Sequence, residues 1–381
     1  MRKKVLVVTE GNAYSPQIWS NVPYFVVTTL EKKGFRVINV NVGMSSSTTD
    51  RLLRSIARKS KKLFGLGDLF DYDRTLLWKS LQDQKVRNYV KAYPDAAFLL
   101  YISTTPVKLP SGIKTSLLFD FSIDYTIRQL QNREPMAAEK LFLERQNAVL
   151  TRMDCVFVLF EKAAQYYRRT LEGGHFYNLP GHFINSDETD FDAAALYEKR
   201  LLSRRILFIG KIHYLGGANC LARAVTAYNQ NHSENPLILD VIGMDTDQLA
   251  IQDERIRCYG ILDKGKAEQK QKYYSLIQEA RAVVNTTANW GGITGITEAL
   301  WYGLPVITSR YDGFVNIFGD EISFGYYCEP EDDVELEAKL EQLMSLPAAS
   351  YLKMEAAAHD SVKDFSWDNY IDRMLAVLAK S

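Results

Sequence analysis

The stretch that decides the fold runs from Asn285 to Arg310 and has the sequence NTTANWGGITGITEALWYGLPVITSR. A strand-like apolar run, residues 282–285, leads into it, and residues 304–308 form a second such run. Between the two runs we expect a glycine loop and then a helix at about residues 294–302, which Gly303 is well placed to end. Strand, glycine loop, helix and strand in this order form the unit of a parallel α/β sheet.

The glycine loop predicts an anion site, because ligands of parallel sheets bind at the carboxyl ends of the strands. Glycines let backbone N–H groups approach an anion closely, and a helix N-terminus adds a partial positive charge. Glu298, expected in the first turn of the helix, could accept hydrogen bonds from hydroxyl groups beside that anion. Phosphate and hydroxyl groups together suit a nucleotide-sugar. The alternative is that the glycines only close a turn and that Glu298 only compensates the helix dipole.

The same stretch resembles the C-terminal signature of the family 4 retaining glycosyltransferases. The resemblance implies the GT-B fold, an α/β fold with two Rossmann-like parallel-sheet domains facing a deep interdomain cleft. The matching residues are Glu298-Ala299-Leu300, Gly303 and Pro305-Val306. The family usually has a second acidic residue eight positions before the glutamate, and that position is Trp290 here. The E-x7-E motif is therefore half present, and Trp290 could stack on a deoxy or less polar sugar face.

Composition indicates an ordinary globular protein of two domains, with 381 residues, 46% of them hydrophobic and 24% charged. The four cysteines are widely spaced and form no CxxC pair, so they predict neither a zinc site nor a disulfide framework and suit a reduced, cytoplasmic setting. No apolar run approaches the ~20 residues of a membrane span. The apolar run after Met1-Arg2-Lys3-Lys4 is too short for a signal peptide and predicts a buried first strand instead.

The net charge is zero, but it is unevenly distributed along the chain. Residues 1–200 contain 29 Lys and Arg against 21 Asp and Glu, a balance of +8, and residues 201–381 contain 17 against 25, a balance of −8. This split suggests two domains with different partners. The basic amphipathic stretch Arg51–Phe70 could contact an anionic membrane at its inner face, or it could be a solvated helix packed on its own domain. We expect no nucleic-acid partner, because no binding motif accompanies the charge.

The first half of the chain predicts a Rossmann-like domain, residues 1–185. Strands are expected at residues 4–9, 35–42, 96–102, 114–119 and 154–160, and helices at residues 23–33, 139–152 and 161–171. Gly11 matches the family's first glycine loop, although a simple turn also explains it. Asp120 and Asp124 follow the fourth strand, where related enzymes place a histidine or an aspartate near the sugar and the acceptor. The alternative is that Asp120 or Ser122 caps the next helix.

The second half predicts the donor-binding domain, residues 203–365, after a linker at residues 180–205. The terminal helix, residues 366–381, is expected to pack back on the first domain. Gly210 and Lys211 follow a strand, at a place where the family usually has Arg and, five residues later, Lys, both of which hold the donor diphosphate. The second position is Gly216 here, and Lys211 can still act as a point charge. Gly216 and Gly217 begin a helix whose amides could replace the missing lysine.

The sequence therefore predicts a metal-independent, retaining glycosyltransferase that moves a hexosyl or deoxyhexosyl group from a nucleotide-sugar to a saccharide or lipid-linked acceptor, in surface polysaccharide or glycoconjugate synthesis. No cofactor is expected besides the nucleotide-sugar co-substrate. Alternatives are a non-catalytic accessory subunit of the same fold and a nucleotide-sugar epimerase. The candidate catalytic residues are Asp120, Lys211 and Glu298, and Asp124 is the acceptor candidate. The donor candidates are Gly11, Gly210, His213, Gly216, Gly217, Tyr259, Gly260, Ile261, Trp290, Gly291, Gly292, Ile293 and Thr294.

Overall fold

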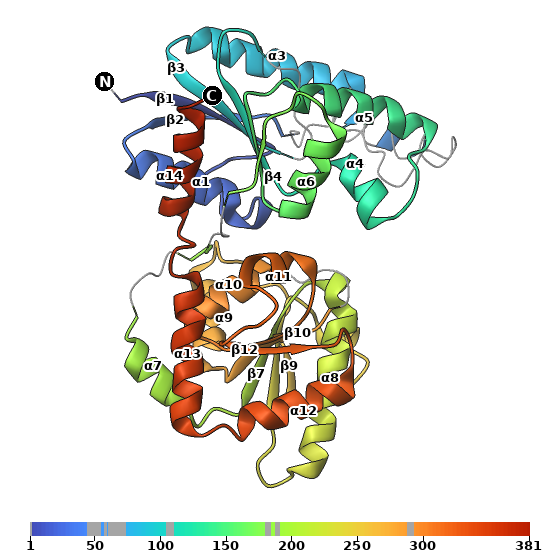
Figure 1. Ribbon diagram of the computed structural model, residues 1–381, viewed down its shortest axis with the longest axis vertical. Coiled ribbons are helices and arrows are strands. Elements are labelled where there is room, and N and C mark those ends of the chain that lie inside the picture. Colours follow the sequence, from blue (N-terminus) through green and yellow to red (C-terminus); the bar gives the residue numbers. More distant parts are fainter. Residues whose placement is uncertain are drawn as a thin grey trace. The chain divides into compact units, whose positions relative to one another are not determined.

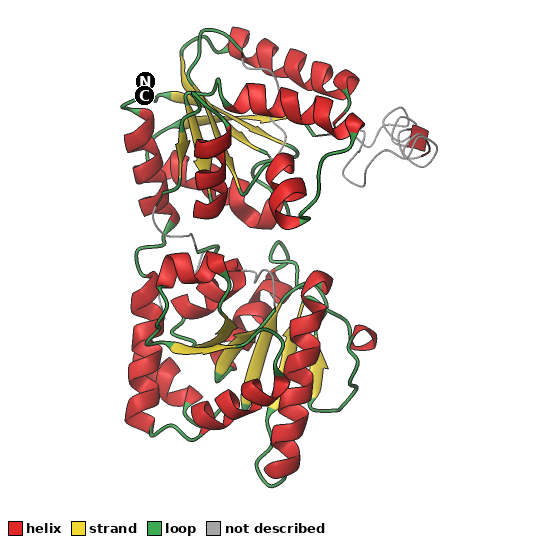
Figure 2. Ribbon diagram, turned by 45° about the vertical axis from the view of Figure 1, so that its right-hand side comes forward, coloured by secondary structure: helices red, strands yellow, loops and turns green. Residues whose placement is uncertain are grey.

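The structure is a computed structural model that describes residues 2–43, 55–56, 59, 74–103, 110–179, 184–186, 191–287 and 293–381. The chain divides into two compact units (Figure 1). Unit 1 comprises Met1–Pro180 and Trp367–Ser381, and unit 2 comprises Gly181–Ser366. Each unit holds one parallel six-stranded sheet with helices on both faces (Figure 2). The α/β prediction with two Rossmann-like sheets is thereby confirmed.

The sheet of unit 1 has the strand order β2-β1-β3-β4-β5-β6, and every pair is parallel. The direction in which the strands are added reverses between β1 and β3. Strands buried on both faces explain the nearly continuous apolar runs in the sequence. The strands are β1 (Lys4–Thr9), β2 (Arg36–Asn41), β3 (Ala96–Ile102), β4 (Thr115–Phe119), β5 (Cys155–Val158) and β6 (Phe176–Tyr177).

The helices of unit 1 cover the two faces of this sheet. On one face, Leu6, Leu99 and Leu117 share a core with residues of α3 (Leu76–Ala92), α5 (Ala137–Leu150) and α6 (Glu161–Thr170). Away from this core, α1 (Val22–Lys32) packs against α14 (Trp367–Leu378), the C-terminal helix, which also contacts β5. Figure 1 shows α14 beside α1. The fourth strand is followed by the short α4 (Ile123–Tyr125), which Ser122 caps by accepting a hydrogen bond from the Tyr125 amide at 3.2 Å.

The sheet of unit 2 has the strand order β12-β11-β10-β7-β8-β9, again all parallel. The direction in which strands are added reverses between β7 and β10. This is the order of a dinucleotide-binding Rossmann sheet. The strands are β7 (Arg205–Ile209), β8 (Ile238–Ile242), β9 (Ile256–Cys258), β10 (Ala282–Asn285), β11 (Val306–Ser309) and β12 (Gly325–Cys328).

The helices of unit 2 also form two layers. One face of the sheet shares a core with α8 (Leu215–Asn231) and α12 (Asp333–Met344). The other face shares a core with α9 (Ala267–Glu279), α10 (Ile293–Trp301), α11 (Asp312–Phe318) and α13 (Ala348–Val362). The positions of α8 and α10 matter for function, because each helix begins just beyond the carboxyl end of one of the two central strands.

The predicted linker at residues 180–205 is wrong in its second part, where the structure has α7 (Ala193–Arg200). The helix contacts α9 and α13. Its last residue, Arg200, is fully buried and donates hydrogen bonds to the carbonyls of Tyr302 and Ile277, at 2.7 and 3.2 Å. These partners lie far away in the sequence, so local composition could not predict the docking of this segment.

Candidate functional site

The two central strands of unit 2, β7 and β10, end where the direction of strand addition reverses. In open α/β sheets the ligand crevice lies at this point, outside the carboxyl ends of the strands. The chain continues from β7 through Gly210 and Lys211 into α8, and from β10 through Thr286 and Thr287 toward α10. Two helix N-termini therefore lie at the same crevice, and each helix directs the positive end of its dipole toward it.

Two glycines let these helix N-termini lie close to the strand ends. A Cβ atom on Gly217, in the first turn of α8, would lie 2.5 Å from Oγ1 of Thr287. A Cβ atom on Gly295, in the first turn of α10, would lie 2.9 Å from Cγ2 of Ile209. Any side chain at these positions would push the helices away from the crevice. Glycine has the same role in nucleotide-binding sheets, where it lets the backbone of a helix come close to a strand.

Lys211 and His213 lie in the short connection between β7 and α8, and both are exposed. The ring of His213 lies against Tyr214, with 4.1 Å between the ring centroids. Gly216 is exposed in the first turn of α8, and a Cβ atom there would lie 2.4 Å from Oε1 of Glu331. The carboxylate of Glu331 thus lies beside Gly216, the position at which the family 4 glycosyltransferases, which the sequence resembles, usually have a lysine. Glu331 has a left-handed backbone with φ 56°, and nothing in the local sequence predicts its position.

Glu298 lies in the second turn of α10, not in the first turn as expected, and its side chain is only 1% exposed. Lys264, in the connection between β9 and α9, donates hydrogen bonds to both carboxylate oxygens, at 2.7 and 2.8 Å. The hydroxyl of Tyr273, on α9, donates to Oε2 at 2.6 Å. Burial, together with the adjacent carboxylate, raises the pKa of Tyr273 well above its ordinary value. Nothing in the sequence around Glu298 predicts either partner.

This network leaves the carboxylate of Glu298 little capacity for a ligand. A carboxylate has about four lone-pair sites, and Lys264 and Tyr273 occupy three of them. The ammonium of Lys264 also lies 3.4 Å from the Asn185 carbonyl and 4.4 Å from the centre of the Tyr273 ring. Of the pair, Lys264 is the more accessible, with its side chain 17% exposed. An ion pair, rather than the free carboxylate that we expected, therefore lies behind the N-terminus of α10.

Three of the donor candidates, Tyr259, Gly260 and Ile261, directly follow β9. The Tyr259 amide donates to the Val241 carbonyl at 2.9 Å, and the Gly260 amide donates to the Met244 carbonyl at 3.0 Å. These two N–H groups are therefore not available to a base. The hydroxyl of Tyr259 donates to the buried carboxylate of Asp240 at 2.9 Å, so this hydroxyl is engaged within unit 2. Ile261 is 69% exposed.

In unit 1, Asp120 lies at the carboxyl end of β4 and is partly buried. Burial raises the pKa of its carboxyl group to about 6. Asp124, the acceptor candidate, is engaged within the protein: its carboxylate accepts from the Tyr166 hydroxyl at 2.7 Å and from Arg128 Nε at 3.0 Å. Gly11 has φ 139°, and a Cβ atom there would lie 2.2 Å from Cδ1 of Ile18, so the turn itself needs this glycine.

Several predicted features lie outside the described residues. Among the donor candidates these are Trp290, Gly291 and Gly292, whereas Ile293 and Thr294 are the first two residues of α10. The basic stretch Arg51–Phe70 also lies outside, apart from Ser55, Ile56 and Lys59. Among the described residues there is no group of three or more His, Cys, Asp or Glu side chains that could hold a metal ion. None of the helices described is long and apolar enough to cross a membrane.

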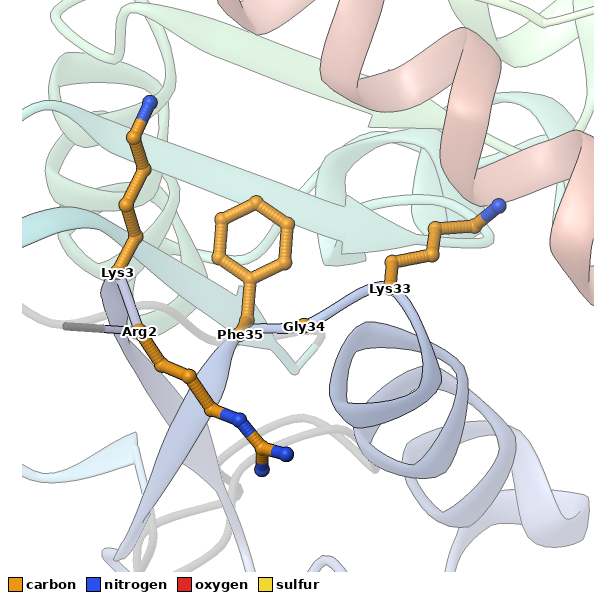
Figure 3. A pocket seen from close by; sticks show the side chains of 5 residues that line it. All are labelled: Arg2, Lys3, Lys33, Gly34 and Phe35. Carbon is orange, nitrogen blue, oxygen red and sulfur yellow. The ribbon is translucent and has the colours of Figure 1, made fainter.

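An open pocket of about 610 Å³ in unit 1 is lined by Arg2, Lys3, Lys33, Gly34 and Phe35 (Figure 3). These residues lie where β1 and β2 begin, so the pocket is at the edge of the sheet opposite to the carboxyl ends of the strands. The ammonium of Lys33 is paired with Asp372 of α14 at 2.7 Å. The pocket is therefore not the ligand site that the sheet topology predicts, which lies at the carboxyl ends of the strands.

Part of the chain is similar to a known protein family. Residues 203–345 match the family model of glycosyl transferases group 1. This segment contains β7 to α12 and therefore both helix N-termini of the crevice. No curated protein sequence matches the chain significantly.

Solved structures match over the whole chain. Sucrose-phosphate synthase from Thermosynechococcus elongatus matches with a TM-score of 0.62 and 15% identity, covering 100% of this chain and 99% of that one. WaaG, a glycosyltransferase involved in lipopolysaccharide biosynthesis, matches with a TM-score of 0.62 and 13% identity over 98% of both chains. The N-terminal domain of trehalose-6-phosphate phosphatase from Candida albicans matches with a TM-score of 0.68 and 11% identity, covering 100% and 97%.

At these identities the structural matches show the fold, which is that of the GT-B glycosyltransferases. The family match in unit 2 supports glycosyl transfer as the class of activity. Together they relate residues 203–345 to the glycosyl transferases group 1 and the fold of the whole chain to that of GT-B glycosyltransferases.

Proposed function

We propose that the chain is a retaining glycosyltransferase, similar to family 4, which moves a hexosyl or deoxyhexosyl group to a saccharide or lipid-linked acceptor without a metal ion. The observation that carries the proposal is the pair of helix N-termini at the crevice of unit 2, inside the segment matched to group 1 glycosyl transferases. Two positive dipole ends and the exposed ammonium of Lys211 suit a diphosphate.

In this proposal the diphosphate lies between the N-termini of α8 and α10. Lys211 and the helix dipoles would stabilise the negative charge that develops on the leaving phosphate, and such preorganised charges are usually the largest contribution to catalysis. Exclusion of water from the reacting centre would protect the donor from hydrolysis. The pair of Lys264 and Glu298, rather than Glu298 alone, would then lie beside the ribose. The acceptor would bind unit 1 near Asp120.

Calorimetric titration with a panel of nucleoside diphosphates and nucleotide-sugars tests the donor site. We expect one nucleotide to bind, and Lys211→Met to weaken its binding about tenfold, the effect of one charge-assisted hydrogen bond. Lys353→Met is the matched control, because Lys353 is an exposed lysine on α13 of the same unit. If the folded wild-type protein binds none of the panel, the donor site does not exist as proposed.

Turnover tests the remaining parts of the proposal. The anomeric configuration of the product, followed by NMR, distinguishes retention from inversion, and activity after treatment with a chelator tests independence from metal. Surface polysaccharide or glycoconjugate synthesis at the cytoplasmic face of a membrane is the setting we propose. In that setting the basic stretch Arg51–Phe70 would contact anionic lipid. Flotation with phosphatidylserine vesicles, compared with phosphatidylcholine vesicles, tests this contact.

A non-catalytic accessory subunit is the second candidate. Two observations favour it: the carboxylate of Glu298 is engaged by Lys264 and Tyr273, and the carboxylate of Glu331 lies beside Gly216. Such a protein would bind the nucleotide-sugar without transferring or hydrolysing the sugar. Tight donor binding with no turnover on any acceptor would favour this second candidate over the enzyme.

A further inference from the structure

The carboxylate of Glu331 lies against the first turn of α8, at the crevice of unit 2. Glu331 belongs to the connection between β12 and α12. A Cβ atom on Gly216 would lie 2.4 Å from its Oε1 and 2.7 Å from its Oε2, so both carboxylate oxygens contact this turn of the helix. The next residue of α8, Gly217, lies against Thr287 just beyond the end of β10. The negative charge of Glu331 is therefore placed where the two central strands of the sheet end.

The backbone of Glu331 is fixed at this place. Its amide donates a hydrogen bond at 3.0 Å to the carbonyl of Thr286, which directly follows β10. Glu331 has φ 56°, a left-handed value that non-glycine residues rarely adopt. Such a conformation costs free energy and persists only where its surroundings enforce it, and residues of this kind are concentrated at functional sites. The hydrogen bond to Thr286 holds the carboxylate at the crevice in spite of this cost.

The neighbouring acidic side chains of the same connection have structural roles. The carboxylate of Asp332 caps α12 by accepting from two backbone amides of its first turn, at 3.1 and 2.9 Å. Asp333 pairs with Arg223 of α8 at 3.1 Å. Among the residues that the structure describes, the exposed carboxylate of Glu331 forms neither a hydrogen bond nor an ion pair. Its charge is therefore available to act on a ligand of the crevice.

Glycosyl transfer changes the charge of the ligand that lies beside this carboxylate. A nucleotide-sugar carries a charge of about −2 on its diphosphate. When the bond between the sugar and the diphosphate breaks, the electron pair stays on the phosphate oxygen. The free nucleoside diphosphate then carries a charge of about −3, because its terminal phosphate has a second ionisation near pH ~6. In the free protein Glu331 interacts favourably with the positive dipole end of α8. It repels any phosphate bound there, and it repels the product more strongly than the donor.

We propose that Glu331 is a specificity-determining residue that distinguishes the donor from the product by charge: its carboxylate weakens the binding of the free nucleoside diphosphate more than that of the nucleotide-sugar. The proposal rests on the proposed function, because the diphosphate must lie at the N-termini of α8 and α10. Lys211 attracts both ligands, and Glu331 opposes this attraction most where the charge of the ligand is greatest. Because product release limits the turnover of many enzymes, such a residue favours the next catalytic cycle.

The test is calorimetric binding of UDP and UDP-glucose, GDP and GDP-mannose, and ADP and ADP-glucose to the full chain at about pH 8, where the terminal phosphate is ionised. We expect Glu331→Gln to strengthen the binding of the free diphosphate about fivefold more than that of the nucleotide-sugar, the effect of one unit charge at about 4 Å in water. Glu331→Lys reverses the charge and should about double this change on a logarithmic scale. Glu341→Gln, in the last turn of α12, is the matched control and should leave the preference unchanged.

Two further measurements distinguish repulsion by charge from a structural role of Glu331. Below about pH 6 the product loses its additional charge, so the wild type and Glu331→Gln should show the same preference between product and donor. Screening in about 1 M salt should also bring the two proteins together. If Glu331→Gln keeps the wild-type preference at about pH 8, this proposal is overturned and the donor site stands. If neither the folded wild type nor the variants bind any of these nucleotides, the donor site and this proposal fail together.

Discussion

Removing the ammonium of Lys264 should destabilise unit 2 strongly. Its Nζ lies 2.7 and 2.8 Å from the two oxygens of Glu298, whose side chain is 1% exposed. Lys264→Met leaves a buried carboxylate with Tyr273 as its remaining side-chain donor. Breaking a buried ion pair in this way lowers the free energy of unfolding by about 3–5 kcal/mol, because the remaining charge is uncompensated. We expect a loss in this range.

The matched control is Lys339→Met on α12 of the same unit. Lys339 is paired with Glu335 at 3.7 Å, and both side chains are about one-third exposed. A surface pair of this kind contributes less than about 1 kcal/mol. Both variants make the same chemical change, so the difference between their free energies of unfolding measures the effect of burial and geometry on the ion pair.

Guanidinium unfolding combined with hydrogen exchange of peptides from α10 would measure the loss within unit 2. The double variant Lys264→Met with Glu298→Gln removes both charges, so it should cost at least about 2 kcal/mol less than the sum of the single variants. If Lys264→Met lowers the free energy of unfolding no more than Lys339→Met, or if the two single effects simply add, the buried pair of Lys264 and Glu298 does not stabilise unit 2.

Three further predictions follow from other parts of the chain. Gly217→Ala should destabilise unit 2 by about 1–3 kcal/mol, because its Cβ would meet Thr287 at the end of a strand. Gly216→Ala should be neutral or stabilising by up to about 1 kcal/mol, because only the exposed carboxylate of Glu331 must move. Thermal unfolding compares the two variants, and equal effects would contradict the packing argument. Burial raises the pKa of Glu355 from 4.5 to about 7, so the folded state binds this proton more tightly than the unfolded state does. The protonated carboxyl therefore contributes fully to stability below pH 4.5, and the contribution is lost as the pH rises through 7. Denaturation curves measured over a series of pH values should show this loss of stability in the wild type and not in Glu355→Gln. Deleting residues 367–381 removes five buried side chains of α14, each of which contributes about 1.5–3 kcal/mol. Their sum equals the stability of a typical domain. Hydrogen exchange should therefore show unit 1 unprotected and unit 2 protected, and protection retained in unit 1 would disprove this estimate.

Much of the fold could be predicted from the sequence, because the relevant signals are local. Strands β1, β3 and β10 lie at the predicted residues, since a strand buried on both faces needs a short apolar run. The helix after β10 is displaced by one residue from its predicted bounds. The glycines at the starts of α8 and α10 were recognisable as well, although the atoms that they approach were not.

The site was less predictable, because its partners come from distant parts of the chain. Glu298 was identified from its motif, but Lys264 lies 34 residues away and Tyr273 lies 25 residues away. Asp124 was assigned to an acceptor, although Tyr166, 42 residues away, occupies one of its oxygens. A carboxylate can be recognised in a sequence, but the groups that neutralise it are set by which loops meet in space.

The sequence by itself determined the α/β class, the two parallel sheets and the glycines of the crevice, because apolar runs and glycines act on the backbone within a few residues. Only the tertiary structure decided which charged groups remain available to a ligand. The packing of distant segments brings Lys264 and Tyr273 to Glu298 and Tyr166 to Asp124, so both carboxylates are engaged within the protein. The chemical role of a carboxylate depends on its burial and its donors, and both depend on how the elements pack.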